Sequence, residues 1–167
     1  SKLDAQEHGP RAVTSMASVA LVSLEPASAA LSGTKAMARV LEALSASNAE
    51  VLALSSSSYR QNFCFLVRKD ELAAVLECLE STLSLELAHG YLRPIGVDEN
   101  VGLLSVVGEG MKGTPGLAGR IFTAISRENV NIIAIAQGSS ELTISIVVRR
   151  DGLEKAVQAI HAECRIG

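Results

Sequence analysis

The sequence contains few aromatic residues and few cysteines, and its net charge is close to zero. Only 3% of its 167 residues are aromatic and none is tryptophan, so any core must be built from aliphatic side chains. The net charge of -3 gives no electrostatic reason to expect a nucleic-acid partner. Cys64, Cys78 and Cys164 form no paired motif, which argues against a zinc site or a disulfide framework. We therefore expect a reduced, cytoplasmic setting.

Long apolar runs and catalytic motifs are also missing. No apolar run approaches the roughly 20 residues of a membrane span, and no signal peptide opens the chain. The three histidines, His8, His89 and His161, share no metal-binding spacing, and neither a P-loop nor a GxSxG motif occurs. We expect no membrane partner and no catalysis by this chain alone. Because the sequence begins without methionine, we also expect it to be a piece of a longer protein.

The clearest positive feature is an internal repeat. The segment from Val19 to Val67 is a weaker copy of the segment from Val101 to Val148. Residues 19 and 23 match 101 and 105, and after a one-residue deletion the matched pairs are Arg39/Arg120, Ser45/Ser126 and Asn48/Asn129. A solenoid needs at least about three repeats, so the two copies predict two compact modules side by side.

Hydrophobic periodicity assigns similar elements to both copies. In the first part we expect strands at 11–16, 19–24, 50–55, 61–68 and 85–95, and helices at 34–47 and 70–82. Asp70 is placed to cap the second of these helices. In the second copy we expect strands at 102–107, 131–137 and 141–149, a helix from Pro115 with Leu117, Ile121 and Ile125 facing the core, and a last helix at 151–162.

This order is βαββαβ followed by βαββα, so the second copy lacks a strand. The ferredoxin-like plan needs four strands per module, and the spare strand at 11–16 fills the gap. The fold class is therefore α+β, with two ferredoxin-like modules. We expect residues 1–10 to be a tail or linker, 17–96 the first module, and 11–16 with 97–167 the second.

The glycine-rich segment Gly108–Gly116 is the first candidate for binding. Glycines let a backbone approach a ligand closely, and the following helix N-terminus favours a carboxylate. Glu109 or Glu141 would then face an ammonium group. Asn131 and Gln137 flank a strand that we expect to be mostly buried, where amides need hydrogen-bond partners. The alternatives are a structural turn for the glycine-rich segment, a backbone cap for Asn131, and a solvated hairpin turn for 139–141.

Four stretches together resemble a known family. Residues 106–111, 113–116, 129–133 and 137–141, which read VVGEGM, GTPG, NVNII and QGSSE, resemble the regulatory ACT domain of aspartate kinases. The resemblance covers residues 11–164. The stretch 86–94, ELAHGYLRP, resembles the threonine-sensitive branch, in which the kinase is often fused to homoserine dehydrogenase.

The resemblance implies a fold and a ligand. In that family two ACT modules follow the kinase domain, and the C-terminal module borrows a strand from before the first. Threonine or lysine binds at ACT–ACT interfaces, between the glycine-rich loop of one module and the start of the second strand in its neighbour. The implied effector-binding residues are Gly108, Glu109, Gly110, Met111, Lys112, Gly113, Thr114, Pro115, Gly116, Asn131, Ile132, Gln137, Ser140 and Glu141. We favour threonine because no clear acidic pair is available for a lysine side chain.

The resemblance also implies partners for this chain, and the first module departs from the family pattern. The chain would form a homodimer through its ACT modules and act on a kinase domain of the same protein. ATP and magnesium would belong to that absent domain, so we expect no cofactor here. The first module departs from the pattern: Glu25–Ala30 replaces the glycine-rich loop, Ser56 stands in place of Gln137, and Arg60 in place of Glu141. Alternatives are a free-standing double-ACT sensor or regulatory subunit, and a ferredoxin-like interaction module without ligand.

Overall fold

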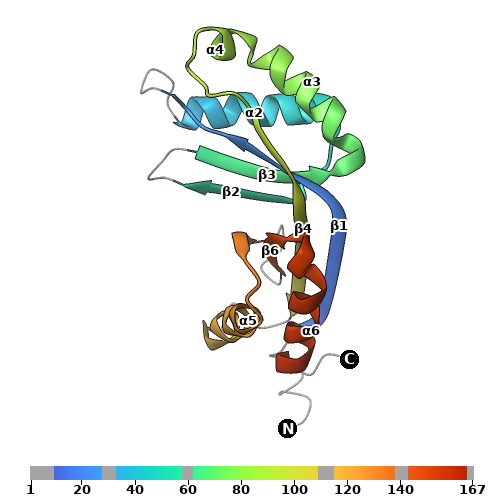
Figure 1. Ribbon diagram of the computed structural model, residues 1–167. Coiled ribbons are helices and arrows are strands. Elements are labelled where there is room, and N and C mark those ends of the chain that lie inside the picture. Colours follow the sequence, from blue (N-terminus) through green and yellow to red (C-terminus); the bar gives the residue numbers. More distant parts are fainter. Residues whose placement is uncertain (1–9, 28–32, 58–61, 109–114, 138–142, 165–167) are drawn as a thin grey trace. The chain divides into compact units, whose positions relative to one another are not determined.

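The computed structural model describes residues 10–27, 33–57, 62–108, 115–137 and 143–164 (Figure 1). The chain divides into two compact units. We call Ser18–Glu99 the first module, and Ser1–Ala17 with Asn100–Gly167 the second module.

Two long strands contribute residues to both modules. Strand β1 spans Pro10–Leu24 and β4 spans Gly96–Gly108, and the hydrogen-bonded strand order is β2-β3-β1-β4-β6-β5. The second module therefore contains the start of β1 beside β4, β6 and β5, which confirms that an N-terminal strand completes its sheet. The prediction of two separate strands at 11–16 and 19–24 is wrong, because β1 is continuous.

The first module follows the βαββαβ plan. After β1 come helix α2 (Gly33–Ser47), strands β2 (Ala53–Ser57) and β3 (Asn62–Arg68), helix α3 (Leu72–Thr82) and the short helix α4 (Ser84–Ala88). Strand β3 pairs antiparallel with both β1 and β2. The buried core is almost entirely aliphatic, as the composition predicts, and consists of Val22, Leu24, Ala36, Val40, Ala43, Leu44, Phe63, Phe65, Val67, Val75, Leu79, Leu83 and Leu92.

Two predictions for the first module are wrong. The predicted strand at 85–95 is instead α4 followed by an extended segment. The fourth strand comes from the start of β4, where a Cβ built on Gly96 would lie 3.5 Å from Ser23 Cβ. Asp70 does not cap α3, because it lies inside a 3-10 turn at Lys69–Glu71 that precedes the helix. Neither the turn nor α3 has a side-chain cap at its N-terminus.

The second module repeats the plan. Helix α5 (Pro115–Arg127) is followed by strands β5 (Ile132–Gln137) and β6 (Thr143–Arg149), a 3-10 turn at Arg150–Gly152, and helix α6 (Leu153–Cys164). The expected core stripe of α5 is confirmed at Ile121 and Ile125, both fully buried; the side chain of Leu117 lies outside the described residues. The remaining core residues are Leu104, Val106, Val130, Ile146, Val148, Leu153, Ala156 and Ile160.

Strand β5 is less buried than the sequence predicts. It lies at the edge of the sheet order and pairs with β6 alone. Asn131, just before the strand, is exposed, and the Ile135 side chain is 46% exposed. The run of isoleucine and alanine, apolar on both faces, predicts a mostly buried strand, and this prediction is wrong at Ile135 of this edge strand.

The repeat is visible in backbone geometry. Asn48 and Asn129 are matched residues of the two copies, and both have a φ of 57°. Each follows the end of its module's first helix and donates its backbone N–H to a carbonyl three residues earlier, at 3.3 and 3.0 Å. Asparagine tolerates this left-handed conformation better than most residues, so it ends both helices.

Candidate functional site

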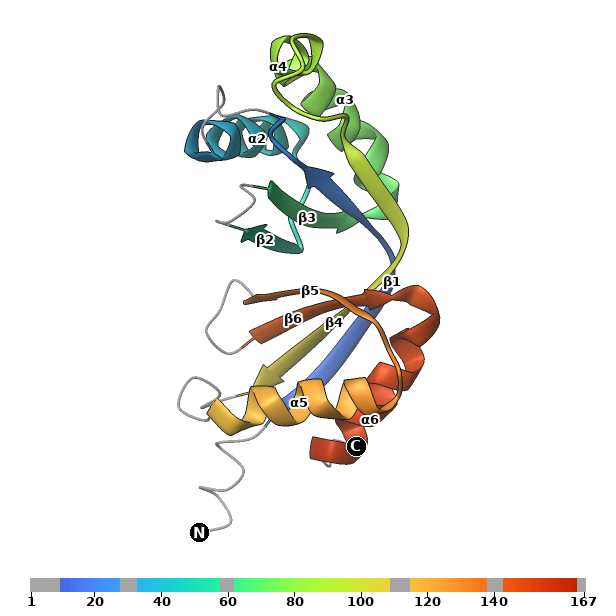
Figure 2. The same cartoon turned by 60° about the vertical axis from the view of Figure 1, so that its left-hand side comes forward.

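Three element ends meet at one end of the second module. Strand β4 ends at Gly108, α5 begins at Pro115, and β5 ends at Gln137. The register supports this, because Val106 pairs with Ile144 and Ile144 pairs with Gln137 across the sheet. Figure 2 shows the ends of β4 and β5 and the start of α5 on the same side of the module. Because the family resemblance assigns the effector to these stretches, we call this region the effector end.

The start of α5 suits an anion. Its first turn contains no acidic residue, so no carboxylate of that turn offsets the partial positive charge of the helix N-terminus. Pro115 has no N–H, but the following amides of the first turn have no partner within the helix. Gly116 is exposed, and a Cβ built there would meet nothing within 4 Å. A small carboxylate can therefore approach this turn closely.

The predicted site residues that the structure describes fall into two groups, one at the effector end and one at the opposite end of β5. Gly108, Pro115, Gly116 and Gln137 lie at the effector end, although the side chains of Pro115 and Gln137 lie outside the described residues. The residues Glu109–Thr114, Ser140 and Glu141 also lie outside them.

Asn131 and Ile132 lie at the opposite end of β5. The carbonyl of Asn131 accepts the backbone N–H of Arg149 at 3.1 Å. Six residue-to-residue steps along an extended strand lead from Asn131 to Gln137, a distance of roughly 20 Å. One module alone therefore does not bring the two groups to the same small ligand.

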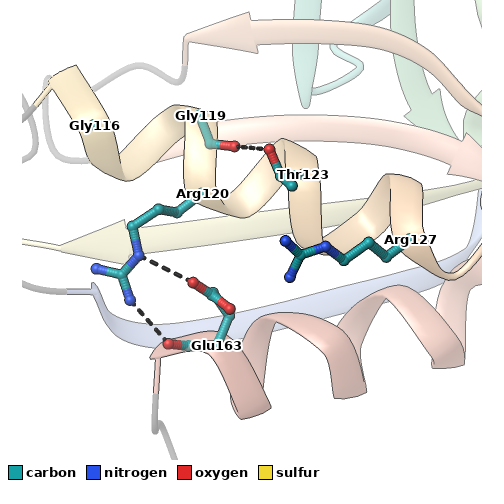
Figure 3. Close-up of a pocket in the computed structure, with 6 residues that line it drawn as sticks. All are labelled: Gly116, Gly119, Arg120, Thr123, Arg127 and Glu163. Carbon is teal, nitrogen blue, oxygen red and sulfur yellow. Dashed lines mark hydrogen bonds and ion pairs between the residues drawn. The ribbon is translucent and has the colours of Figure 1, made fainter.

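A pocket of about 320 Å³ lies on the outward side of α5 (Figure 3). Only Gly116 of its lining belongs to the predicted site; the other lining residues are Gly119, Arg120, Thr123, Arg127 and Glu163. Arg120 pairs with the Glu163 carboxylate, Nε to Oε1 at 3.0 Å, and its Nη2 donates to the Glu163 carbonyl at 3.1 Å. The Thr123 hydroxyl donates to the Gly119 carbonyl at 2.7 Å.

Arg120 has a structural counterpart in the first module. Arg39 donates from Nη2 to the carbonyl of Thr82 at 2.5 Å and from Nε to Glu86 Oε1 at 3.2 Å. Thr82 precedes Glu163 by the same 81 positions that separate Arg39 from Arg120. In both modules an arginine of the first helix (α2 or α5) therefore binds the last turn of the second helix (α3 or α6). A cation at that position offsets the negative end of the helix dipole. The matched arginines in the repeat were the sequence signal for this contact.

The rest of the pocket lining differs between the copies. Gly116, Gly119, Thr123 and Arg127 correspond to Lys35, Ala38, Glu42 and Ala46 when the same 81-residue spacing is applied. The arginine contact is therefore shared framework, while this surface is particular to the second module.

The described residues also include three free cysteines, Cys64, Cys78 and Cys164. Burial raises the pKa of the Cys64 thiol, and it also raises the pKa of Cys164, where the charge of nearby Arg120 opposes the shift. Among the described residues, no group of three or more His, Cys, Asp or Glu side chains is placed to hold a metal ion. No helix in the described part of the chain is long and apolar enough to span a membrane.

Comparison with known proteins agrees with this architecture. Residues 104–164 match the ACT domain family. The chain is 36% identical over 162 residues to the chloroplastic bifunctional aspartokinase/homoserine dehydrogenase 1 of Arabidopsis thaliana, and 42% identical over 125 residues to the bifunctional aspartokinase/homoserine dehydrogenase of Haemophilus influenzae. These alignments cover 96% and 74% of this chain.

Two solved structures of aspartate kinase proteins have the same fold as this chain. The ligand-free regulatory subunit of aspartate kinase from Thermus thermophilus superposes with a TM-score of 0.75 at 25% identity, over 92% of this chain and 98% of that one. Aspartate kinase from Clostridium acetobutylicum gives 0.74 at 26% identity, over 91% of this chain and 34% of that one.

The fold and the family match define a protein built from ACT domains, in which two ferredoxin-like modules both include residues of β1 and β4. Within that class, the chain belongs to the regulatory ACT regions of aspartate kinases. It spans only 17% and 15% of the two bifunctional relatives that it matches.

Proposed function

We propose that this chain senses an amino acid, with threonine favoured over lysine, and that it controls the aspartate kinase activity of a longer protein. The observation that supports the proposal is the effector end, where the end of β4, the start of α5 and the end of β5 lie on the same side of the second module. The ligand's carboxylate lies at the N-terminus of α5, and the neutral amide of Gln137 hydrogen-bonds the ligand. The chain itself supplies no catalytic group and needs no cofactor. ATP and magnesium bind the kinase domain.

The control is allosteric. An amino acid shifts the equilibrium between active and inhibited enzyme only by the difference between its affinities for the two states. We propose that the intact protein joins this region to both a kinase and a homoserine dehydrogenase, because both bifunctional relatives align over most of the chain. Threonine is favoured because the stretch 86–94 resembles the threonine-sensitive branch. We propose a cytoplasmic location, although the Arabidopsis relative is a chloroplast protein by name.

The split of the predicted site supports a homodimer. Asn131 and Ile132 lie too far from Gln137 to share a ligand within one module. They reach the same ligand when the start of β5 in one chain lies beside the effector end of another. The open edge of β5, with Ile135 exposed, provides a surface for such pairing.

A second candidate is a separate regulatory subunit. The Thermus thermophilus chain, which is matched over 98% of its own length, is by name a regulatory subunit of aspartate kinase. The reading frame upstream of Ser1 distinguishes the two: a kinase domain joined in frame supports the fused enzyme, and its absence supports the subunit.

The proposed ligand contact predicts a loss of affinity in Gln137→Ala. A lost hydrogen bond to a charged ligand costs about 1.5–3 kcal/mol, which corresponds to a roughly tenfold to hundredfold weaker Kd for threonine. Isothermal titration calorimetry measures this, with Ser56→Ala, the matched position of the first module, as the control. Unchanged threonine affinity in Gln137→Ala would place the site elsewhere.

A further inference from the structure

The pocket on the outward side of α5 is lined by two guanidinium groups and one carboxylate, those of Arg120, Arg127 and Glu163. The carboxylate is already bound, because Glu163 Oε1 accepts the Nε–H of Arg120 at 3.0 Å. Arg120 also donates from Nη2 to the Glu163 carbonyl at 3.1 Å, so these two residues neutralise each other. The charge that remains unbalanced in the lining is the positive charge of Arg127.

Arg127 has no hydrogen-bond or ion-pair partner in the described part of the chain. Its side chain extends along α5 on the same side as Arg120 and Glu163, with no interaction to either (Figure 3). A guanidinium presents its donors in a planar fork, which matches a phosphate or a carboxylate through two parallel hydrogen bonds. The fork of Arg127 is therefore open to an oxyanion from outside the chain.

Glycines leave room for a ligand beside this charge. Gly116 and Gly119 line the pocket, and a Cβ built on either one meets nothing within 4 Å. The volume of about 320 Å³ is at the lower end of the range for small-molecule sites, about 300–1,000 Å³. The Thr123 hydroxyl donates to the Gly119 carbonyl at 2.7 Å, which leaves its oxygen as an acceptor. A small molecule with an oxyanion and a hydrogen-bond donor suits this lining.

The first module lacks the unbalanced charge. Ala46 stands at the position of the second arginine, and Glu42 at the position of the threonine. Nη1 of Arg39 lies 3.9 Å from Glu42 Oε2, and its Nε lies 3.2 Å from Glu86 Oε1. With Lys35 at the position of the first glycine, the positive and negative charges of this surface are equal in number. The excess positive charge is thus particular to the second module, whereas the arginine contact is common to both.

A cation in the last turn of α5 also has an ordinary structural role. Arg127 lies in that turn, where a positive charge offsets the negative end of the helix dipole. That role needs the charge alone, and a lysine serves it as well. Recognition of an oxyanion by two parallel hydrogen bonds needs the fork, so the two roles can be separated by experiment.

We propose that this pocket is a second ligand site, beside the effector end, which binds the phosphate or carboxylate group of a small molecule. The fork of Arg127 holds the oxyanion, the Thr123 hydroxyl oxygen accepts a hydrogen bond from the ligand, and the body of the ligand lies over the glycines at the start of α5. The proposal concerns a different surface from amino-acid sensing and stands or falls independently of it.

NMR on the whole isotope-labelled chain tests the site without any amino-acid effector. Inorganic phosphate, titrated at an ionic strength kept constant with chloride, should move the side-chain Nε–H signal of Arg127 and the amide signals of Gly119 and Thr123 along one saturable curve. The Nε–H of Arg93, an exposed arginine of the first module, should not follow that curve. A parallel titration with succinate shows whether a carboxylate is bound in place of a phosphate. No saturable shift of Arg127 with either anion, or an equal shift of Arg93, would overturn the proposal.

Two substitutions in the pocket should have opposite effects on phosphate binding, read from the amide signals of the pocket. Arg127→Ala should weaken binding by about tenfold, the loss expected when a hydrogen bond to a charged group is removed. Glu163→Gln should strengthen binding, because it removes the carboxylate from the lining. Arg93→Ala and Glu25→Gln make the same charge changes at an exposed ion pair of the first module and should leave binding unchanged. Equal effects of the two pairs would show attraction to net charge alone and overturn the proposal.

Arg127→Lys separates the ligand contact from the helix dipole. It keeps the charge in the last turn of α5, so the Tm without phosphate should equal that of the unmodified chain. Phosphate affinity should nevertheless fall towards that of Arg127→Ala, because a lysine cannot form two parallel hydrogen bonds from a fork. Unchanged phosphate affinity in Arg127→Lys would overturn the assignment of the fork to the oxyanion.

Discussion

Individual glycines of the second module differ in what surrounds them. Gly119 lies on the exposed side of α5, and a Cβ built there meets nothing within 4 Å. Gly152 is buried in the turn before α6, where a Cβ would lie 2.7 Å from Val130 Cγ1. The same change to alanine therefore has opposite consequences at the two positions.

We predict that Gly119→Ala raises the free energy of unfolding by about 0.5–1 kcal/mol, because alanine loses less backbone entropy in a helix. Gly152→Ala should lower it by about 1–3 kcal/mol, because the branched Val130 side chain must move in a packed core. Urea unfolding of both variants beside the unmodified chain measures the pair. A stabilised Gly152→Ala would show that Val130 has room to move.

Most helices and strands could be predicted from the sequence. The long-range contacts that replace the predicted strand at 85–95 by α4 and an extended segment could not. The 3.6-residue stripe of α5 and the alternation in β6 are local patterns, so they could be read directly. The stretch 85–95 alternates like a strand, yet its backbone bonds go to Glu25–Ala27 and its carboxylate Glu86 goes to Arg39. These partners lie far away in the sequence, so no local pattern contains them.

The candidate site was predictable only as a set of motifs. The sequence assigns the glycine-rich segment and Gln137 to one site, and the end of β4, the start of α5 and the end of β5 lie on the same side of the second module. The family resemblance assigns Asn131 to the same site as the start of the second strand in a neighbouring module, and within one module it lies at the other end of β5 from Gln137. The length of β5 fixes this separation, and the sequence already predicted the two residues at opposite ends of one strand; which chain supplies Asn131 depends on pairing between modules, which a motif does not reveal.

The N-terminus of α5 allows a test of the carboxylate contact. Glutamate in the first turn of a helix interacts favourably with the dipole by about 0.3–1 kcal/mol, and Gly116 has open space for a side chain. Gly116→Glu should therefore stabilise the fold while weakening threonine binding by charge repulsion. Gly116→Gln is the neutral control, expected to stabilise less and to bind threonine more tightly than the glutamate variant. Thermal unfolding and calorimetry on both chains measure the two effects. Equal threonine affinity in the two variants would argue that the carboxylate binds elsewhere.

At the scale of the whole molecule, binding and pairing should be linked. If two chains contribute to one site, a ligand that binds the dimer and not the monomer must strengthen dimerisation by mass action. We predict that sedimentation equilibrium shows a dimer whose dissociation constant falls when threonine is added. A monomer at tens of micromolar, with and without threonine, would contradict the shared site.

The central claim is that this chain senses an amino acid for an aspartate kinase. The most direct measurement is the thermal unfolding of the unmodified chain in the presence of each of the twenty amino acids in turn. A ligand at 100 times its Kd adds about 2.7 kcal/mol to the stability of the folded state, so a true effector produces a clear rise in Tm. We predict the largest rise in Tm with threonine, a smaller or absent rise with lysine, and none with the remaining amino acids. No shift with either threonine or lysine would contradict it.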